Sequence, residues 1–238
     1  MFNLEKARGN SEETRARILE IALQSFRERG FDTTTMRDIA AAAGMALGAA
    51  YYYFPSKDAI IQAYYEEVQK EHARRVSAAL ADPKLELKER LRMAMHAKLD
   101  ILQNDRKILR AMFRYAGDPE HPLCMLGPGT LELRGQSIAI FAQAVGDERL
   151  PEDIREFLPL GLWALHMGIM LYFIYDQSAA QQRTRRLVDG ALDLAVRLIA
   201  LVRFPLLKPL RGSVLQLLLD AGLLSSSSAV LSVKEERP

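Results

Sequence analysis

Few residues of this 238-residue chain have the types and spacing that covalent or metal chemistry needs. The chain has one cysteine and four histidines, and it contains no nucleophile elbow, phosphate-binding loop or zinc-binding helix motif. His96 and Asp100 stand four residues apart, so a helix would place them on one face, but no third metal ligand accompanies them. The sequence therefore predicts no metal site and no cofactor, and it predicts that the protein is not an enzyme.

Composition predicts a cytoplasmic globular protein. Cys124 is the only cysteine, so an intrachain disulfide is excluded, and residues 1–14 are too polar for a signal peptide. The net charge is +2, and residues 1–60 hold eight basic and eight acidic side chains. Nucleic-acid binding therefore has to be argued from pattern, because the basic surface typical of such proteins is missing.

Helical periodicity governs the first thirty residues. Ser11 followed by Glu12 and Glu13 predicts a helix start, because acidic side chains favour the first turn. One apolar stripe follows at helical spacing, formed by Ile18, Leu19, Ala22, Leu23 and Phe26. Gly30 is the expected left-handed residue that ends this helix.

Three further helices are expected before residue 81. A short one opens at Thr35, whose capping-box partner is Asp38, and it ends at Gly44. A third short helix and a longer fourth helix follow, over 46–52 and 57–80.

The remaining chain also shows helical patterns, without a convincing period of two, so an all-α fold is predicted. The expected helices cover 85–103, 105–116, 130–145, 152–176, 179–204 and 206–221. We expect a small N-terminal domain of three helices over 1–57 and a larger helical domain over 58–222. The serine-rich and charged end, 223–238, has the composition of a flexible tail.

The segment 33–57 has the pattern of a helix-turn-helix, with two short helices joined by a tight turn at Gly44. Ala40 and Ala43 are small enough to let two helices cross closely. The core expected beneath them consists of Leu23, Phe26 and Ile39.

Residues 14–57 resemble the DNA-binding domain of the tetracycline-repressor (TetR) family of bacterial regulators. The agreement extends over many positions at fixed spacing: Arg17, Ile18, Leu19, Glu20, Ala22, Phe26, Gly30, Phe31, Thr34, Thr35, Met36, Ile39, Ala40, Ala43, Gly44, Met45, Gly48, Tyr51, Tyr52, Tyr53, Phe54, Lys57 and Asp58. The rest of the chain is similar to the family in its length and helical character.

The resemblance implies a role for each matching position. Thr35 and Lys57 would contact DNA phosphates, and Tyr52 and Tyr53 would contact the edge of the groove. Gly48 would let the recognition helix approach the duplex. The residues expected to face bases are Met45, Ala46, Leu47 and Ala49. Tyr51 fits a DNA contact and a core position equally well.

The recognition helix departs from common base-reading chemistry, because it carries no Arg, Lys, Asn or Gln. Base readout would then come from apolar contact with thymine methyl groups, from tyrosine hydroxyls and from Arg37 on the preceding helix. We expect modest specificity for each half-site, with DNA shape and dimer spacing supplying the rest. A core position is the alternative for the aromatic run, above all for Tyr51 and Phe54.

Residues 158–175 contain no Asp, Glu, Lys or Arg. A membrane span is one interpretation of such a run, but Pro159, Gly161 and Gly168 weaken it, so a helix buried on two sides is favoured. In the TetR family, the last two long helices of each subunit form a four-helix dimer interface. The resemblance therefore implies a homodimer through the helices near 152–176 and 179–204, with no membrane partner.

Methionine and aromatic residues are concentrated in the middle helices, which is typical of an adaptable apolar pocket. The candidate effector contacts are His96, Met112, Phe113, Phe141, Trp163, His166, Met167 and Met170. Ordinary core packing is the alternative for each of them. As a group they favour a small apolar or aromatic effector, which the two histidines would orient.

The sequence thus predicts a DNA-binding transcriptional regulator, a repressor that such an effector releases from a palindromic operator on double-stranded DNA. An α-helical enzyme with an apolar substrate and a DNA-binding module without an effector are the two alternatives.

Overall fold

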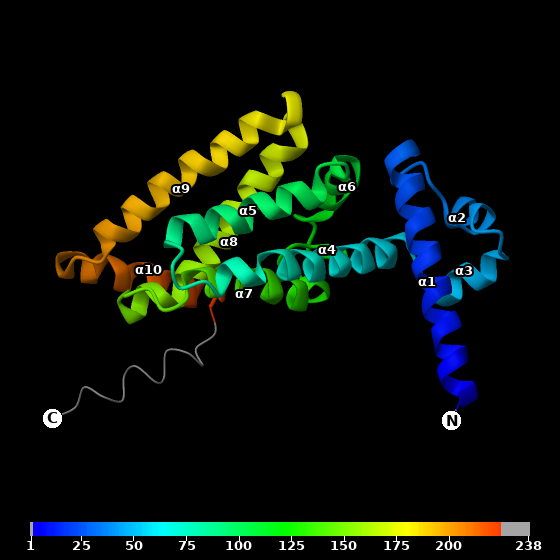
Figure 1. Cartoon of the computed structure of the whole chain (residues 1–238), viewed down its shortest axis with the longest axis horizontal. Helices are drawn as coiled ribbons and strands as arrows, with labels where there is room; N and C mark the ends of the chain where they lie inside the picture. The colour runs from blue at the N-terminus through cyan, green and yellow to red at the C-terminus, as the bar shows by residue number, and fades with distance from the viewer. Residues whose placement is uncertain (1, 225–238) are drawn as a thin grey trace. The chain divides into compact units, whose positions relative to one another are not determined.

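The computed structural model describes residues 2–224, which form ten α-helices and no β-strand (Figure 1). The helices are α1 (Phe2–Arg29), α2 (Met36–Ala42), α3 (Leu47–Tyr53), α4 (Lys57–Leu80), α5 (Leu87–Leu102), α6 (Arg106–Tyr115), α7 (Leu131–Val145), α8 (Glu152–Tyr175), α9 (Gln182–Val202) and α10 (Lys208–Asp220). The all-α class is confirmed, and helices α2 to α10 follow the expected ranges closely. Most of the expected tail, 225–238, lies outside the described residues.

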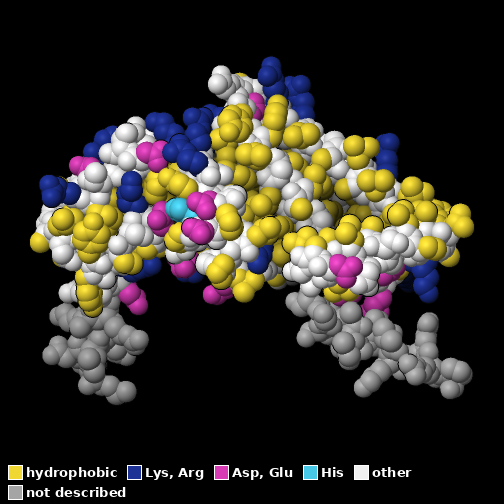
Figure 2. Space-filling view, turned by 180° about the vertical axis from the view of Figure 1, so that it is seen from behind, with side chains coloured by type: hydrophobic (Ala, Val, Ile, Leu, Met, Phe, Trp, Pro, Cys, Tyr) yellow, Lys and Arg dark blue, Asp and Glu magenta, His cyan; other side chains and the backbone are white. Residues whose placement is uncertain are grey.

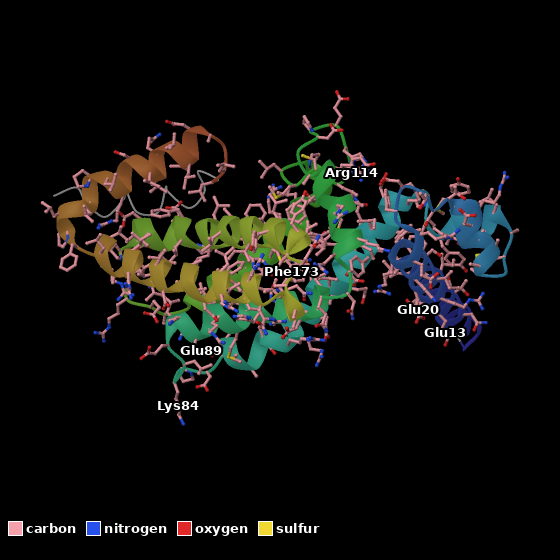
Figure 3. The ribbon with its side chains drawn as sticks, turned by 90° about the horizontal axis from the view of Figure 1, so that it is seen from above. Glu13, Glu20, Lys84, Glu89, Arg114 and Phe173 are labelled. Carbon is pink, nitrogen blue, oxygen red and sulfur yellow. The ribbon has the colours of Figure 1, made fainter. Side chains whose placement is uncertain are left out.

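The helix start expected at Ser11 is wrong, because α1 begins at Phe2. Residues 2–10 include the helix formers Leu, Glu, Lys and Ala and contain no proline, so a helix can begin before Ser11 despite Gly9. The Thr14 hydroxyl donates to the carbonyl of Asn10 at 2.7 Å, a bond typical of a helix interior. Glu12 and Glu13, which were expected in the first turn, therefore lie in the interior of α1. The side chains of Glu13 and Glu20 point away from the helix (Figure 3).

Local signals fix the end of α1 and both ends of α2 as expected. Gly30 and Gly44 adopt φ angles of 96° and 66°, which side chains other than glycine rarely adopt. At the start of α2, the Thr35 hydroxyl accepts from the Asp38 amide while the Asp38 carboxylate accepts from the Thr35 amide. Both bonds of the predicted capping box are therefore present.

The described residues pack into two compact units that do not follow chain order. The first unit contains the chain up to Arg75, residues 98–136 and residues 173–175. The second contains residues 76–97, 137–172 and 176–224. These packing units do not test the boundary expected at residue 57, which separates the DNA-binding part of the chain from the rest. That boundary stays a prediction.

Each unit has its own buried apolar interior. In the first unit, α1, α2, α4 and α8 contribute fully buried residues such as Phe26, Ile39, Ile60 and Phe173, and Phe173 lies among crowded side chains in Figure 3. In the second unit, Val76, Ala94 and Ile140 form a cluster from α4, α5 and α7.

A buried carboxylate organises the irregular link between α8 and α9. Asp176 accepts four hydrogen bonds, from the amides and hydroxyls of Ser178 and Thr184, at 2.7–2.9 Å. Burial alone would raise its pKa, but these four bonds hold the pKa of Asp176 well below its usual value. The link includes Ala180 and Gln181 with φ angles of 49° and 52°, so two side-chain-bearing residues are held in the left-handed region.

Candidate nucleic-acid interface

Small residues stand where α2 and α3 meet. Ala40 and Ala43 are buried, Gly44 makes the turn, and the amide of Met45 donates to the carbonyl of Ala40 at 3.0 Å. From α1, the Arg17 guanidinium donates to the carbonyl of Ala43 at 3.3 Å. The predicted core is confirmed, since Leu23, Phe26 and Ile39 are all buried.

The outer face of α3 is open. Ala50 is the buried residue of this helix, whereas Ala46, Gly48 and Ala49 are exposed. Met45 and Leu47 are half-buried. Of the four residues expected to face bases, two are exposed and two are half-buried, and their contacts with bases stay a prediction.

The aromatic run at the end of α3 divides between surface and core. Tyr52 is 81% exposed, and its ring meets that of Tyr53 edge to face, with centroids 5.2 Å apart. Tyr51 is 46% exposed, so the core alternative for this residue is wrong. Phe54 is 1% exposed and packs beneath the guanidinium of Arg15, at 4.8 Å, so the core alternative for Phe54 is confirmed.

Thr35 is exposed at the N-terminus of α2, and its hydroxyl serves the capping box. The hydroxyl donates to Asp38 Oδ2 at 2.7 Å, and the hydrogen bonds from Thr35 lower the pKa of Asp38. Arg37, the next residue but one, is also exposed. The start of α2 therefore presents one hydroxyl held by the capping box and one exposed cation.

Lys57 has a structural partner that the sequence did not reveal. Its ammonium donates to the carbonyl of Phe31 at 2.6 Å and lies 4.4 Å from the centre of the Phe31 ring. At the same helix start, the Ser56 hydroxyl accepts from the amide of Ala59 at 3.1 Å. Because an ammonium carries three N–H groups, Lys57 can hold this loop and still donate to a phosphate.

Three of the predicted DNA contacts line a single hollow of about 530 Å³: Thr35, Tyr51 and Lys57. Tyr115 and His121 line it as well, with their rings stacked 4.0 Å apart and nearly parallel. The start of α2, the end of α3 and the start of α4 are thereby brought together, although the residues are spread over 23 positions of sequence.

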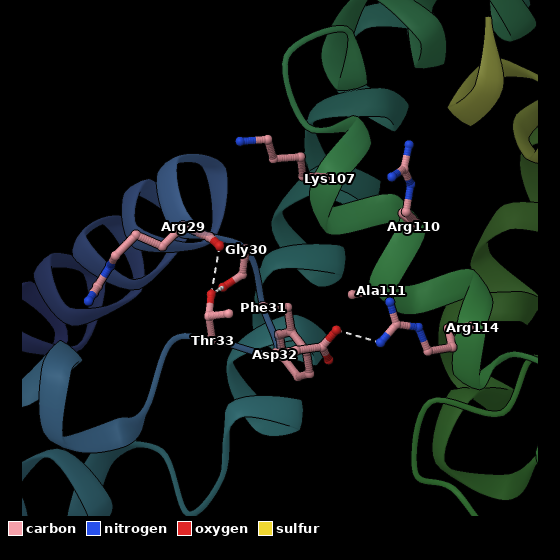
Figure 4. A pocket seen from close by; sticks show the side chains of 9 residues that line it. All are labelled: Arg29, Gly30, Phe31, Asp32, Thr33, Lys107, Arg110, Ala111 and Arg114. Carbon is pink, nitrogen blue, oxygen red and sulfur yellow. Dashed lines mark hydrogen bonds and ion pairs between the residues drawn. The ribbon is translucent and has the colours of Figure 1, made fainter.

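A second hollow of about 230 Å³ lies between the end of α1 and α6 (Figure 4). Lys107, Arg110 and Arg114 project from α6 around it, and the dashed line in Figure 4 joins Arg114 to Asp32. The Lys107 ammonium donates to the carbonyls of Arg27 and Glu28 at the end of α1. Lys107 therefore ties α6 to the end of α1, and Arg114 ties α6 to the segment that follows α1.

Two family models match the chain at the places where this geometry is found. Residues 18–64 match the model described as bacterial regulatory proteins, tetR family, and residues 90–217 match the tetracyclin repressor-like, C-terminal domain. The second match alone covers more than half of the chain. The chain belongs to the TetR family.

Individual relatives agree with this assignment. The chain is 29% identical over 131 residues to the probable HTH-type transcriptional regulator ArpR of Pseudomonas putida, covering 55% of this chain and 60% of ArpR. It is 47% identical over 47 residues to the HTH-type transcriptional repressor KstR2 of Rhodococcus jostii, covering 20% of this chain and 23% of KstR2. The matches thus span less than two thirds of these relatives.

A solved structure agrees in fold. The TetR transcriptional regulator from Nitrosomonas europaea aligns with a TM-score of 0.61 at 19% identity, over 76% of this chain and 97% of that one. The predicted class, an N-terminal helix-turn-helix followed by a larger helical part, is confirmed.

In this TetR-family chain the predicted effector residues are divided between the two compact units, and their joint role stays a prediction. Met112 and Phe113 are half-buried on α6 in the first unit. The others lie in the second unit, where Phe141, Trp163, His166 and Met170 are buried and Met167 is half-buried. Among these, the rings of Phe141 and His166 lie near one another, with centroids 5.5 Å apart.

His96 belongs to a charged network. Its Nε2 lies 2.9 Å from Asp189 Oδ1, and its Nδ1 lies 3.4 Å from the guanidinium of Arg185. Arg92 also donates to Asp189 at 2.9 Å, and the bonds from His96 and Arg92 outweigh burial and lower the pKa of Asp189. This environment joins α5 to α9 and gives no geometric support to His96 as a contact for an apolar molecule.

A buried carboxylate at the start of α6 was not predicted from the sequence. Asp105 accepts from the Arg27 guanidinium through both of its oxygens and also from the Tyr64 hydroxyl. Burial, and then the bond to Asp105, raise the pKa of Tyr64 above its usual value. Because these partners are 41 and 78 positions away, only the helix start at Asp105 was visible in the sequence.

Lys98 was also missed, although a signal for it exists. It occupies a position in the apolar stripe of α5 that runs through Leu91, Met95 and Leu102, and it is 3% exposed. A charged residue inside such a stripe departs from the periodicity and can be found by inspecting every predicted core position.

Helices α8 and α9 carry apolar faces that nothing in the described chain covers. On α9 the exposed leucines are Leu187, Leu194, Leu198 and Leu201. On α8 the exposed residues include Gly161, Ala164, Gly168, Leu171, Tyr172 and Tyr175. In the view of Figure 2, hydrophobic side chains gather over the surface to which α8, α9 and α10 contribute.

α8 is also long and apolar enough to cross a membrane by length and composition, and half of its most apolar window is buried inside the protein. A core helix of a globular protein has the same properties, so this helix alone is weak evidence for a membrane span.

Proposed function

We propose that this protein is a DNA-binding transcriptional repressor that acts as a homodimer and responds to a small effector. The observation that carries the proposal is the open face of α3, with Tyr52 exposed at its end, inside a segment that matches the TetR family model. The KstR2 relative, whose name describes a repressor, supports the choice of repressor over activator. A regulator of this kind works where its DNA is, in the cytoplasm.

DNA contacts divide into phosphate and base contacts. Thr35, Lys57 and the tyrosines Tyr51, Tyr52 and Tyr53 supply donors to phosphate oxygens, which position the protein on the duplex. The apolar residues 45–49 and Arg37 meet the base edges. Because this surface has few groups that discriminate between bases, specificity depends on the spacing of two half-sites in a palindromic operator.

DNase I footprinting on the DNA that flanks the gene tests this proposal. The full chain should protect a palindrome whose half-sites are about one helical turn apart or a multiple of that distance. Absence of a protected palindrome at micromolar protein would contradict the proposal.

The homodimer forms through the apolar faces of α8 and α9. Their exposed leucines, tyrosines and small residues recur at helical spacing, which suits the packing of two helices from each subunit into a four-helix interface. Large exposed apolar areas of this kind are typical of interaction surfaces.

Light scattering after gel filtration measures the assembly. Leu194→Glu combined with Leu198→Glu should convert a dimer into a monomer, because it buries two charges in the interface. Ala200→Glu is the matched control, since it adds a charge to an exposed position of α9 outside the leucine stripe. A double variant that stays dimeric would exclude this face.

Effector response requires a connection from the interior to the DNA-binding segment. α4 begins at Lys57, one of the proposed phosphate contacts, and it contains Tyr64, which binds Asp105 at the start of α6. We propose that the DNA-binding domain is 1–57 and that 58–222 bind the effector and form the dimer. Operator and effector then favour different separations of the two recognition helices, and each weakens binding of the other by linkage.

A further inference from the structure

Lys98 is a buried cation in an apolar stripe. It is 3% exposed on α5, and Leu99 and Leu102, its neighbours on the same helix, are also buried. A charged group removed from water is unfavourable unless it is paired and hydrogen-bonded. A sequence selected for packing alone would place an apolar residue there.

The groups around the Lys98 ammonium are neutral. It donates to the side-chain oxygen of Gln69 and lies 5.3 Å from the centre of the Tyr65 ring. The Gln69 amide group is itself fixed, because it donates to the carbonyl of Leu133 at 3.1 Å. Tyr65, Gln69 and His72 recur on α4 at spacings of four and three, so one face of that helix carries three polar side chains.

The other buried cations of the described chain have carboxylate partners. Arg90 pairs with Glu148 at 3.0 Å, and Arg211 pairs with Asp153 at 2.7 Å. Among the side chains that the structure describes, those of residues 10–224, no carboxylate lies at ion-pair distance from Lys98. Burial without such a partner lowers the pKa of Lys98 to about 7.

We propose that Lys98 binds the carboxylate of the effector, which is a monocarboxylic acid with an apolar aliphatic or aromatic body. This inference rests on the proposed function, in that it names the chemical class of the effector. A single ammonium is neutralised by a single negative charge, so a monoanion fits better than a phosphate dianion. Tyr65 and Gln69 lie beside the ammonium, and the buried Met95, Leu99 and Leu102, which flank Lys98 on α5, provide apolar surroundings that suit an apolar body.

Isothermal titration with matched acids and alcohols tests the assignment on the purified full chain. The probes are decanoate against 1-decanol, and 4-phenylbutanoate against 4-phenyl-1-butanol. At least one acid should bind the wild-type protein at pH 7 more than tenfold more tightly than its alcohol.

Lys98→Met should reduce the affinity of that acid at least thirtyfold and leave the affinity of the alcohol unchanged. Lys88→Met is the matched control, because Lys88 lies on the same helix with a half-exposed side chain that pairs with Asp193. The control should keep the preference for the acid. Wild-type protein without this preference, or Lys98→Met protein that retains it, would overturn the assignment.

Two measurements keep the test decisive if the variant folds poorly. In wild-type protein, acid binding above pH 8 should take up one proton, and acid affinity should fall about tenfold for each further pH unit, because Lys98 must be protonated to pair. Acid affinity that is constant from pH 7 to 9 contradicts the pairing. DNase I footprinting of the wild-type protein without any acid separates the two proposals. Absence of DNA binding in that experiment would refute the repressor, whereas the titrations would still decide whether Lys98 binds a carboxylate.

Discussion

The head of the molecule, α1 to α3, and the helical remainder are held together by different kinds of signal. In the head, the determining contacts are close in sequence, such as Gly30 at the end of α1 and the Thr35–Asp38 capping box. In the remainder, they join distant segments, such as Arg90 with Glu148, 58 positions apart. Contacts of the first kind can be read from residue order, whereas contacts of the second kind depend on how helices pack.

The largest expected effect concerns the pair that joins α1 to α6. Asp105→Asn removes the charge that binds Arg27 and weakens the bond to Tyr64. We expect a loss of about 3 kcal/mol in the free energy of unfolding, because the buried Asp105 gives up its charged hydrogen bonds from Arg27 and keeps only a weaker bond from Tyr64. Urea denaturation measures it, and Asp118→Asn, an exposed aspartate outside this cluster, is the control. A loss below about 0.5 kcal/mol would show that distant polar pairs do not hold the remainder.

The link between α8 and α9 offers a pH-dependent version of the same test. Asp176→Asn should cost about 2 kcal/mol at pH 7, because hydrogen bonds to a buried carboxylate are lost. The folded protein lowers the pKa of Asp176, so its contribution is present above the unfolded pKa and disappears as the pH falls through the range below about 5. Stability of the wild type should therefore decline more steeply with acid than that of the variant. Parallel pH profiles would contradict the role of this carboxylate.

A smaller effect is expected for the local signal in the head. Thr35→Ala removes one hydrogen bond of the capping box and should destabilise the protein by about 1 kcal/mol. Thr35→Ser restores the hydroxyl, so it should recover both stability and DNA affinity. If the serine variant recovers stability alone, the methyl group of Thr35 takes part in DNA binding.

The smallest effect is a gain. Ala180 has a φ of 49°, and glycine adopts this conformation without steric strain. Ala180→Gly should raise the free energy of unfolding by about 0.5 kcal/mol, since relief of strain exceeds the added flexibility of the unfolded chain. Thermal denaturation of both variants compares this change with Ala200→Gly. The second variant places glycine in the regular helix α9 and should destabilise the protein.

The order of the helices and the helix-turn-helix of α1 to α3 could be predicted from the sequence. Apolar spacing, helix caps and turn glycines are local properties of the chain. The sequence placed Leu23, Phe26 and Ile39 in the core and identified the exposed tyrosine Tyr52. It could not distinguish the environments of Tyr51 and Phe54, since both are aromatic residues in one short run. It also placed the start of α1 too late, because a favourable first-turn pattern at Ser11 does not exclude a helix that begins earlier.

The interior was harder to predict, because residue type alone does not show which side chains meet. His96 was expected beside an apolar effector, but its partners Asp189 and Arg185 lie about ninety positions away. Asp105 and Lys98 were missed for the same reason. Their importance follows from burial and from the presence or absence of an oppositely charged neighbour, which only the packed helices define.

The central claim is that the open end of α3 binds DNA, and Tyr52 tests it most directly. It is 81% exposed, so Tyr52→Ala should leave the fold intact. Fluorescence anisotropy with the footprinted duplex should then show at least tenfold weaker binding for Tyr52→Ala, with unchanged affinity for Leu126→Ala, which alters another exposed apolar residue. Wild-type affinity for Tyr52→Ala, in protein that is folded and dimeric, would contradict this assignment of the DNA-binding surface.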